Sequence, residues 1–272
     1  MNAVVTYIYP DGMIYFDSLL KSLCDQSNND FDLIIFNDGV GTLNEDDEKL
    51  KNLNFGVRIF PMQGSIAEIR FESFEILKRL NYDGYIFQDV DDQMSINRVE
   101  LCKELLSTND VVVNDLKIVT EDGDLAVWKE RIKDLQIITL SDIRRSNIIG
   151  LGNTSIRRSI LKQTPLRRSS LPKAVDWFVF YQILHRGAKA CFTGKCATIY
   201  RQHENNLAGM QKLVTKERLQ HIIDVKKRHY SALSEIGLED FILELTELKN
   251  KQLNKNILLT KNPFWWEETE LI

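Results

Sequence analysis

Short apolar runs alternate with amphipathic segments over the first third of the chain. The runs have the length of strands, and the segments between them carry apolar residues at helical spacing. Strands are therefore expected at residues 4–9, 31–36, 57–60 and 85–88, and helices at residues 15–26 and 65–80, the second opening on a Ser-x-x-Glu capping box. This alternation predicts a parallel sheet with right-handed crossovers, the nucleotide-binding half of an α/β fold.

The rest of the chain has a less regular pattern. Extended segments are expected at residues 111–113, 148–156, 190–192 and 197–200, a hairpin tip at residues 121–124, and a helix at residues 176–186. From about residue 210 the pattern changes to two highly charged amphipathic helices, at residues 213–236 and 238–253. We expect their apolar faces to pack on the preceding domain. The Phe264-Trp265-Trp266 cluster that follows has three interpretations: a membrane anchor, a contact with a partner subunit, or a cover for the core.

Three carboxylates follow the fourth expected strand within four residues, at Asp89, Asp91 and Asp92. Burying several anions at a strand end is costly unless a cation or hydrogen-bond donors compensate them. Ligands usually bind at the carboxyl ends of strands in open α/β sheets. A divalent ion that takes oxygen ligands and also bridges to phosphate would explain the cluster. A solvated acidic turn is the alternative, and the cluster alone does not decide between the two.

The composition is that of an ordinary globular protein, with 272 residues, 43% of them hydrophobic and 27% charged. The formal net charge of −4 argues against a general nucleic-acid binder. One stretch departs from this average, because residues 141–173 hold eight basic side chains and one acidic residue, Asp142. Such a stretch is either a solvated face or a surface that contacts an anionic substrate or a membrane.

The four cysteines have neither zinc-site nor Cys-x-x-Cys spacing and are typical of thiols in a reducing compartment. The first apolar run is too short for a signal peptide, and no run has the length needed to span a bilayer. We therefore expect a cytoplasmic protein, with peripheral contact at the inner face of the membrane left open.

The order of the motifs resembles the family 2 glycosyltransferases, which have the GT-A fold, from Val4 to about Gly209. Residues 15–39 look like the first helix and second strand of that family, which end in an Asp-Asp-Gly-Ser turn that receives the nucleotide base. The turn here is Asn37-Asp38-Gly39-Val40, so the resemblance assigns the base contact to Asp38. The family's Tyr-Asn after the first strand is Tyr9-Pro10 here, and Tyr9 is carried over as a donor-binding residue. A plain Asn-Asp-Gly turn is the alternative.

Two further motifs of the family deal with the diphosphate. The segment from Ser65 to Arg70 resembles the helix start that presents an Arg to the nucleotide or its diphosphate, and both a helix N-terminus and a guanidinium favour anions. The acidic cluster is similar to the family's Asp-x-Asp-Asp motif. The resemblance implies that Asp89 approaches the ribose or the sugar and that Asp91 or Asp92 binds Mg²⁺ or Mn²⁺. The alternative for Arg70 is an exposed helix residue without a ligand.

The remaining motifs concern the acceptor and the loop near the metal. Residues 175–177 resemble the family's Glu-Asp-Trp helix, which makes Asp176 the catalytic base that takes the proton of the acceptor hydroxyl. Asp176 could also cap its helix, and the two roles are compatible. Residues 200–209 are close to the family's Tyr-Arg-x-His-x-x-Asn-x-x-Gly segment, which implies a diphosphate contact for Arg201 and a metal or diphosphate contact for His203. Residues 150–158 look like the strand near the acceptor site, and we assign no catalytic role to them.

The resemblance implies an α/β protein with the GT-A fold, that is, a Rossmann-like, mostly parallel sheet flanked by helices, with a C-terminal helical extension. The expected division is a glycosyltransferase domain over residues 1–209, made of a nucleotide-binding half (1–100) and an acceptor half (101–209), and an extension over residues 210–272. The implied activity is inverting, metal-dependent transfer of a hexose from a nucleotide sugar to an acceptor hydroxyl in cell-surface polysaccharide biosynthesis. The implied acceptor is a glycan or a lipid-linked glycan, and the C-terminal helices offer a surface for homo-oligomers.

Two other functions remain open at this point. A nucleotidyltransferase would share the nucleotide-binding sheet and the metal carboxylates, but it would need a Gly-rich phosphate loop after the first strand, where Gly12 is the single glycine. A nucleotide-sugar-binding protein without activity would explain the departures at Asn37, Val40 and Val175. The retention of Asp91 and Asp176 argues against that second alternative.

Overall fold

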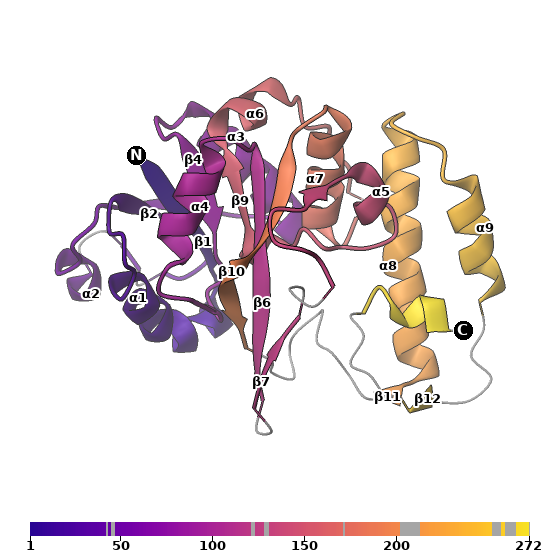
Figure 1. Ribbon diagram of the computed structural model, residues 1–272, viewed down its shortest axis with the longest axis horizontal. Helices are drawn as coiled ribbons and strands as arrows, with labels where there is room; N and C mark the ends of the chain where they lie inside the picture. The colour runs from indigo at the N-terminus through magenta and orange to yellow at the C-terminus, as the bar shows by residue number, and fades with distance from the viewer. Residues whose placement is uncertain are drawn as a thin grey trace.

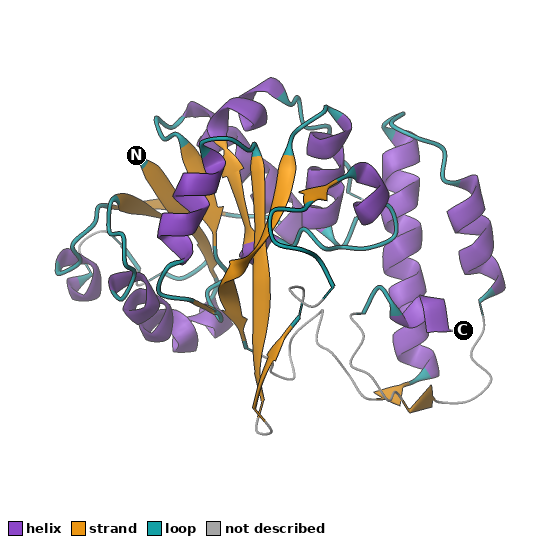
Figure 2. Cartoon of the chain, in the orientation of Figure 1, coloured by secondary structure: helices purple, strands orange, loops and turns teal. Residues whose placement is uncertain are grey.

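The computed structural model is an α/β structure in which helices flank a ten-stranded sheet (Figure 1). It describes residues 1–41, 43–44, 47–120, 123–127, 131–170, 172–201, 213–251, 257–258 and 265–271. The C-terminal helices stand side by side at the edge of the molecule farthest from the N-terminus (Figure 2). Within the described residues, no helix has the length and apolar character needed to cross a bilayer.

The strands of the main sheet follow the order β3-β2-β1-β4-β9-β6-β10-β5, with β7 paired to β6 and β8 paired to β10. Their bounds are β1 Asn2–Ile8, β2 Phe31–Asp38, β3 Val57–Met62, β4 Gly84–Phe87, β5 Gln93–Met94, β6 Val111–Thr120, β7 Gly123–Ala126, β8 Ile137–Ile138, β9 Thr154–Arg157 and β10 Ala190–Tyr200. A separate two-stranded sheet pairs β11 Leu213–Val214 with β12 Ile257–Leu258.

The α-helices are α1 Phe16–Cys24, α2 Glu48–Lys51, α3 Ile66–Arg79, α4 Arg98–Leu106, α5 Leu140–Ile143, α6 Arg158–Gln163, α7 Val175–His185, α8 Lys216–Glu235 and α9 Ile242–Asn250. Short 3₁₀ helices lie at Pro10–Tyr15, Leu151–Asn153 and Glu268–Leu271. The capping box predicted at the start of α3 is present, since the Ser65 hydroxyl accepts from the Glu68 amide and the Glu68 carboxylate accepts from the Ser65 amide.

The first half of the sheet has the predicted parallel arrangement. Strands β3, β2, β1 and β4 run in the same direction. Every residue of β1 is buried, because apolar side chains cover both faces of a parallel sheet. Val4 and Ile8 enter the core on the α1 and α4 side, while Val5 and Tyr7 enter the core on the α3 and α7 side.

The second half of the sheet is mixed. Strand β9 lies antiparallel between β4 and β6, and β10 runs parallel to β6. The two extended segments predicted within residues 190–200 form one strand, β10, with an irregular register between Thr193 and Ala197. Residues 123–126 form β7 of the predicted hairpin, and residues 121–122 of its tip lie outside the described residues.

The C-terminal extension packs on α7. The Trp177 ring of α7 stacks on His229 of α8 with a centroid distance of 3.8 Å, and Trp265 meets the same indole edge-on at 6.2 Å. Trp265 and Trp266 are 6% and 5% exposed. Of the three interpretations of this aromatic pair, the structure therefore supports a cover for the core.

Candidate active site

The carboxyl ends of β1, β2 and β4 bring several of the predicted site residues to one edge of the sheet. The register pairs Ile8 with Asn37, and the Gln88 amide donates to the Val5 carbonyl at 2.9 Å. Tyr9 follows β1, Asp38 ends β2, and the acidic cluster begins two residues after β4. Parallel pairing therefore places these polar side chains along the same edge, as expected for a ligand site in such a sheet.

The turn after β2 explains why Asn occupies position 37. The buried Asn37 amide group donates to the carbonyls of Val40 (2.9 Å) and Leu43 (3.3 Å), and its Oδ1 accepts from the Val40 amide (2.9 Å). A carboxylate could not donate the first two bonds. Gly39 adopts a φ of 82°, which side chains rarely tolerate. Asn37 thus shapes the loop, while the half-buried Asp38 is left at the end of the strand.

Asp89 and Asp91 form the anionic centre of this edge. Burial and then the charge of Asp91 raise the pKa of Asp89 to about 6. The same negative charge acts on the hydroxyl of Tyr9. Burial, and then the charges of Asp91 and Asp89, raise the pKa of Tyr9 to about 12. A carboxylate whose charged form is destabilised in this way favours a cation, or a donor, as its neighbour.

Asp92 has a different set of contacts. Its side chain is 2% exposed, and its Oδ1 accepts from the backbone amide of Arg201 at 2.8 Å. Burial raises its pKa well above the usual value. Asp92 therefore fastens the end of β10 against the acidic segment. This contact leaves Oδ2 as the oxygen for any further ligand.

The buried side chain of Arg98, which was not predicted as a site residue, holds the residues that directly precede the acidic cluster. Arg98 is fully buried and donates from Nη2 to the Phe87 carbonyl (2.7 Å), from Nε to Asn114 Oδ1 (2.8 Å) and from Nη1 to the Gln88 side chain. These bonds tie the end of β4 to β6. The guanidinium charge also lowers the pKa of Asp89, in opposition to the larger effect of burial. The signal in the sequence was the position of Arg98 four residues before Cys102, on the apolar face of its helix.

Arg70 lies across the Tyr7 ring, with 3.3 Å between its guanidinium carbon and the ring centroid. Its charge lowers the pKa of both Asp89 and Asp176 against the larger effect of burial, so it lies close enough to act electrostatically on both carboxylates. Its Nη1 is buried and has no hydrogen-bond partner within the described residues. A buried donor without a partner is costly, and a bound anion is the natural partner for it.

Asp176 stands in the first turn of α7, as predicted. Its Oδ1 accepts from the Trp177 amide at 2.8 Å, and its Oδ2 accepts from the Asn147 side chain at 3.2 Å. Burial raises the pKa of Asp176, and these two hydrogen bonds lower it. The N-cap position belongs to Ala174, so the cap interpretation holds only in the sense that Asp176 bonds an amide of the first turn. Trp177 fixes this turn by donating from its indole to the Ile143 carbonyl at 2.6 Å.

The Gly150-Leu151-Gly152 backbone lies between the two carboxylates. A Cβ on Gly152 would be 2.3 Å from Asp89 Oδ2, and a Cβ on Gly150 would be 3.8 Å from Asp176 Oδ2. Asp176 in turn raises the pKa of Asp89. Glycine is therefore required at 152 for close approach. This turn, to which the sequence assigned no catalytic role, brings Asp89 and Asp176 into one site.

The predicted contribution of the loop after β10 is described only in part. The Arg201 guanidinium lies over the Tyr15 ring at 4.9 Å and donates to Ser18 Oγ at 3.2 Å, so it stays at the rim of this edge. His203 lies outside the described residues. Among the described residues, no group of three His, Cys, Asp or Glu side chains is arranged to hold a metal. Asp89 and Asp91 do offer hard oxygen ligands of the kind that Mg²⁺ or Mn²⁺ takes together with substrate phosphates.

No family model matches the sequence, and no curated protein sequence is detectably similar to it. Solved structures match over most of the chain. S. aureus TarS in complex with UDP-GlcNAc is 16% identical, with a TM-score of 0.61 over 91% of this chain and 78% of that one. The mannosyltransferase PcManGT from Pyrobaculum calidifontis, in complex with GDP-Man and Mn²⁺, is 9% identical, with a TM-score of 0.55 over 86% of this chain and 64% of that one.

GalNAc-T7, with UDP, GalNAc and Mn²⁺, is 13% identical, with a TM-score of 0.56 over 98% of this chain and 56% of that one. These three structures are glycosyltransferases with GT-A-like folds. The predicted GT-A fold is confirmed, with a mostly parallel central sheet flanked by helices.

Proposed function

We propose that this chain is a glycosyltransferase that moves a sugar from a nucleotide-sugar donor to an acceptor hydroxyl. The observation that carries the proposal is the meeting of Asp89, Asp176 and Arg70 at one edge of a GT-A sheet, where the buried Nη1 of Arg70 has no hydrogen-bond partner among the residues that the structure describes. The complexes of similar structures with UDP-GlcNAc and GDP-Man support a donor of this class.

In this proposal the donor lies along the carboxyl ends of β1, β2 and β4. Asp38 accepts from the nucleotide base, Tyr9 contacts the nucleotide, and Arg70 and Arg201 bind the diphosphate. Asp91, with Asp92 Oδ2 and His203, would hold Mg²⁺ or Mn²⁺, and Asp89 would approach the ribose or the sugar. The bound ion would supply neutralisation of the negative charge on the departing diphosphate.

The chemical step is an inverting displacement. The acceptor oxygen forms a bond to the anomeric carbon as the bond from that carbon to the diphosphate oxygen breaks, and the hydroxyl proton passes to Asp176. Burial raises the pKa of Asp176, which makes it a stronger proton acceptor than an exposed carboxylate. Asn147 and the Trp177 amide hold the carboxylate in place. A second carboxylic acid is unnecessary, because the diphosphate is already a good leaving group.

The structure gives the nucleotidyltransferase alternative little support. Gly12 is packed, since a Cβ there would lie 2.7 Å from Val90 and 3.1 Å from the Tyr9 ring. This glycine therefore serves close packing against the acidic segment, whereas a phosphate loop would present its backbone to a ligand.

The remaining parts of the proposal concern the setting of the reaction. We propose the hexosyltransferase type of family 2, a cytoplasmic site of action with peripheral contact at the inner face of the membrane, and an acceptor that is a glycan or a lipid-linked glycan of the cell surface. The C-terminal helices remain the proposed surface for homo-oligomers.

A donor screen tests the proposed function. Hydrolysis and binding of UDP-, GDP- and dTDP-sugars are measured with Mg²⁺, with Mn²⁺ and with EDTA, for the wild type, Asp91→Ala and Arg70→Gln. The matched control is Asp25→Asn, an exposed surface carboxylate. We expect metal-dependent binding of at least one donor, weakened in the two site variants and unchanged in the control. The proposal is wrong if no donor binds with either metal.

A further inference from the structure

Six of the eight basic side chains at residues 141–173 fall into two groups in the structure. The first group holds the C-terminal helices. Arg144 Nε lies 2.6 Å from Glu244 Oε1, Arg145 Nη1 lies 2.9 Å from Glu247 Oε2, and Lys173 Nζ lies 3.1 Å from an oxygen of Asp224. These three side chains are therefore engaged with carboxylates of α8 and α9. They are therefore not available to bind an anionic ligand.

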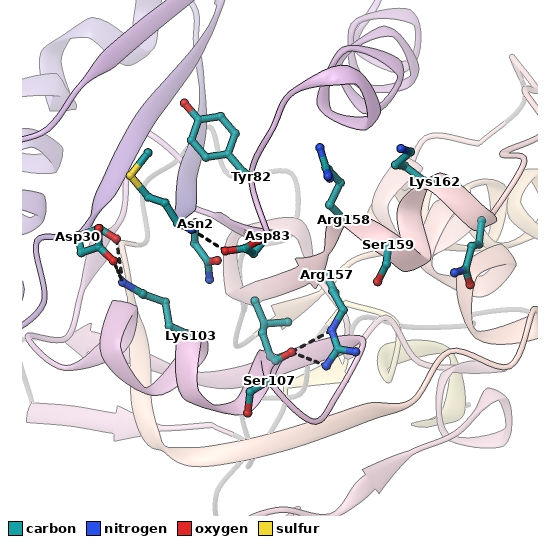
Figure 3. Close-up of a pocket in the computed structure, with 13 residues that line it drawn as sticks. Asn2, Asp30, Tyr82, Asp83, Lys103, Ser107, Arg157, Arg158, Ser159 and Lys162 are labelled. Atoms are coloured by element: carbon teal, nitrogen blue, oxygen red, sulfur yellow. Dashed lines mark hydrogen bonds and ion pairs between the residues drawn. The ribbon is translucent and has the colours of Figure 1, made fainter.

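The second group lines a cavity at the opposite edge of the sheet from the candidate active site. Arg157 ends β9, and Arg158 and Lys162 belong to α6. The cavity has a volume of about 810 Å³ and is bounded further by the starts of β1 and β4 (Figure 3). This volume lies within the range of small-molecule sites.

The charge of this cavity is not balanced by its own carboxylates. Asp30 already accepts from Lys103 at 2.7 Å, and Asp83 already accepts from the amino group of Met1 at 2.5 Å (Figure 3). Both acids are thus satisfied by cations outside the second basic group.

The two arginines of the cavity are held mainly by neutral acceptors. The Leu106 carbonyl accepts from Arg157 Nε at 2.9 Å and from Nη2 at 2.5 Å, and the Leu80 carbonyl accepts from Arg158 Nη1. Arg157 Nη1 also lies 3.7 Å from Oδ1 of Asp110, which is a long ion pair. Carbonyls fix the orientation of a guanidinium without neutralising its charge, so both side chains are pre-organised for an anion.

We propose that this cavity binds the phosphate group of a small, hydroxyl-bearing molecule of the sugar-phosphate class. Arg157, Arg158 and the exposed Lys162 supply the positive charge. Asn2 and Ser107, which also line the cavity, supply neutral hydrogen-bonding groups suited to hydroxyls. This cavity lies at the far edge of the sheet, and its binding of a phosphate would be independent of the proposed transferase activity.

Calorimetric titration tests the site. Inorganic phosphate and a hexose 1-phosphate are titrated into the whole chain. Divalent metal is left out, so that metal-dependent binding at the candidate active site does not contribute. The first variant is Lys162→Glu, because its side chain is exposed and the fold should tolerate the change, and the second is Arg158→Gln. Thermal melting of each variant checks that it is folded. The matched control for charge is Lys216→Glu, an exposed lysine of α8, and the control for the active site is Arg70→Gln.

The hexose 1-phosphate should bind more tightly than inorganic phosphate. Lys162→Glu should weaken both by roughly tenfold or more, since a charge-assisted contact becomes a repulsion, and the two controls should retain wild-type affinity. Binding lost in Arg70→Gln but kept in Lys162→Glu would move the anion to the active site and overturn the proposal. Equal affinity for the two ligands would overturn the sugar-phosphate assignment. Absence of binding to the wild type would overturn the site altogether.

Discussion

His229 should make the stability of this protein fall as the pH is lowered from 7 to 5. Its ring is fully buried, stacks on Trp177, and has neither nitrogen hydrogen-bonded within the described residues. Burial, followed by the charge of Lys226, lowers the pKa of His229 from 6.5 to about 3. Because the folded pKa lies below the unfolded value, only the unfolded chain gains a proton over this range, and the free energy of unfolding decreases.

The size of the effect follows from the two pKa values. At pH 5 the unfolded chain binds the proton almost completely, and the folded chain remains neutral at this ring. Protonation then stabilises the unfolded state by about 2 kcal/mol relative to its free energy at pH 7, at ~1.4 kcal/mol per pH unit. This amount is a large share of the stability of an ordinary domain.

Urea unfolding at pH 7 and pH 5 measures the effect by comparison with His229→Phe, which keeps an aromatic ring against Trp177. The carboxylates of the chain also titrate, but they contribute equally to both proteins and cancel in the comparison. We expect the loss of stability between the two pH values to be about 2 kcal/mol smaller in the variant. Tyr230→Phe, altered in the same aromatic cluster, keeps the histidine and should retain the wild-type loss. Equal losses in wild type and His229→Phe would refute the reasoning.

Three further substitutions test the site and its support. Gly152→Ala places a Cβ 2.3 Å from Asp89 Oδ2, so donor turnover should fall by roughly tenfold or more, whereas Gly41→Ala, with open space at its Cβ, should have wild-type turnover in the same assay. Asn147→Ala removes a hydrogen bond that lowers the pKa of the proposed base, so the acidic limb of the kcat/KM profile should move to higher pH by about half a unit to one unit; an unmoved limb contradicts this. Arg98→Met leaves three buried acceptors unpaired and should lower the free energy of unfolding by about 3 kcal/mol in urea titration, and a loss below about 1 kcal/mol would show that its hydrogen bonds are dispensable.

The parallel half of the fold could be predicted from sequence because its signals are local. Buried parallel strands are continuous apolar runs, and the capping box marks the start of α3 whatever its tertiary surroundings. Helix α4 was not predicted, because its buried face carries Arg98, and a charged residue on an apolar stripe breaks the pattern. The mixed half was harder to predict from sequence. The place of β9 between β4 and β6 depends on pairing between strands that lie far apart in the chain.

The candidate site also combines features that have a local sequence signal with features that depend on tertiary contacts. The order of motifs predicted Asp89, Arg70 and Asp176 as site residues, and the structure brings all three to one edge of the sheet. The device that joins them is the backbone of Gly150 and Gly152, which carries no functional group and so gives no chemical signal in a single sequence. The contact of Asp92 with the Arg201 amide was likewise invisible, because it joins a carboxylate to a backbone atom 109 residues away.

The most direct test of the central claim separates donor binding from transfer in Asp176→Asn. The substitution keeps the size of the side chain and its acceptor for the Trp177 amide, but it removes the carboxylate that would take the acceptor proton. With a donor found by the screen and its metal, we predict that donor affinity stays within about threefold of wild type while the rate of transfer to the acceptor falls by about 10²–10⁴-fold, the usual contribution of a general base. Transfer at the wild-type rate in Asp176→Asn would contradict the account.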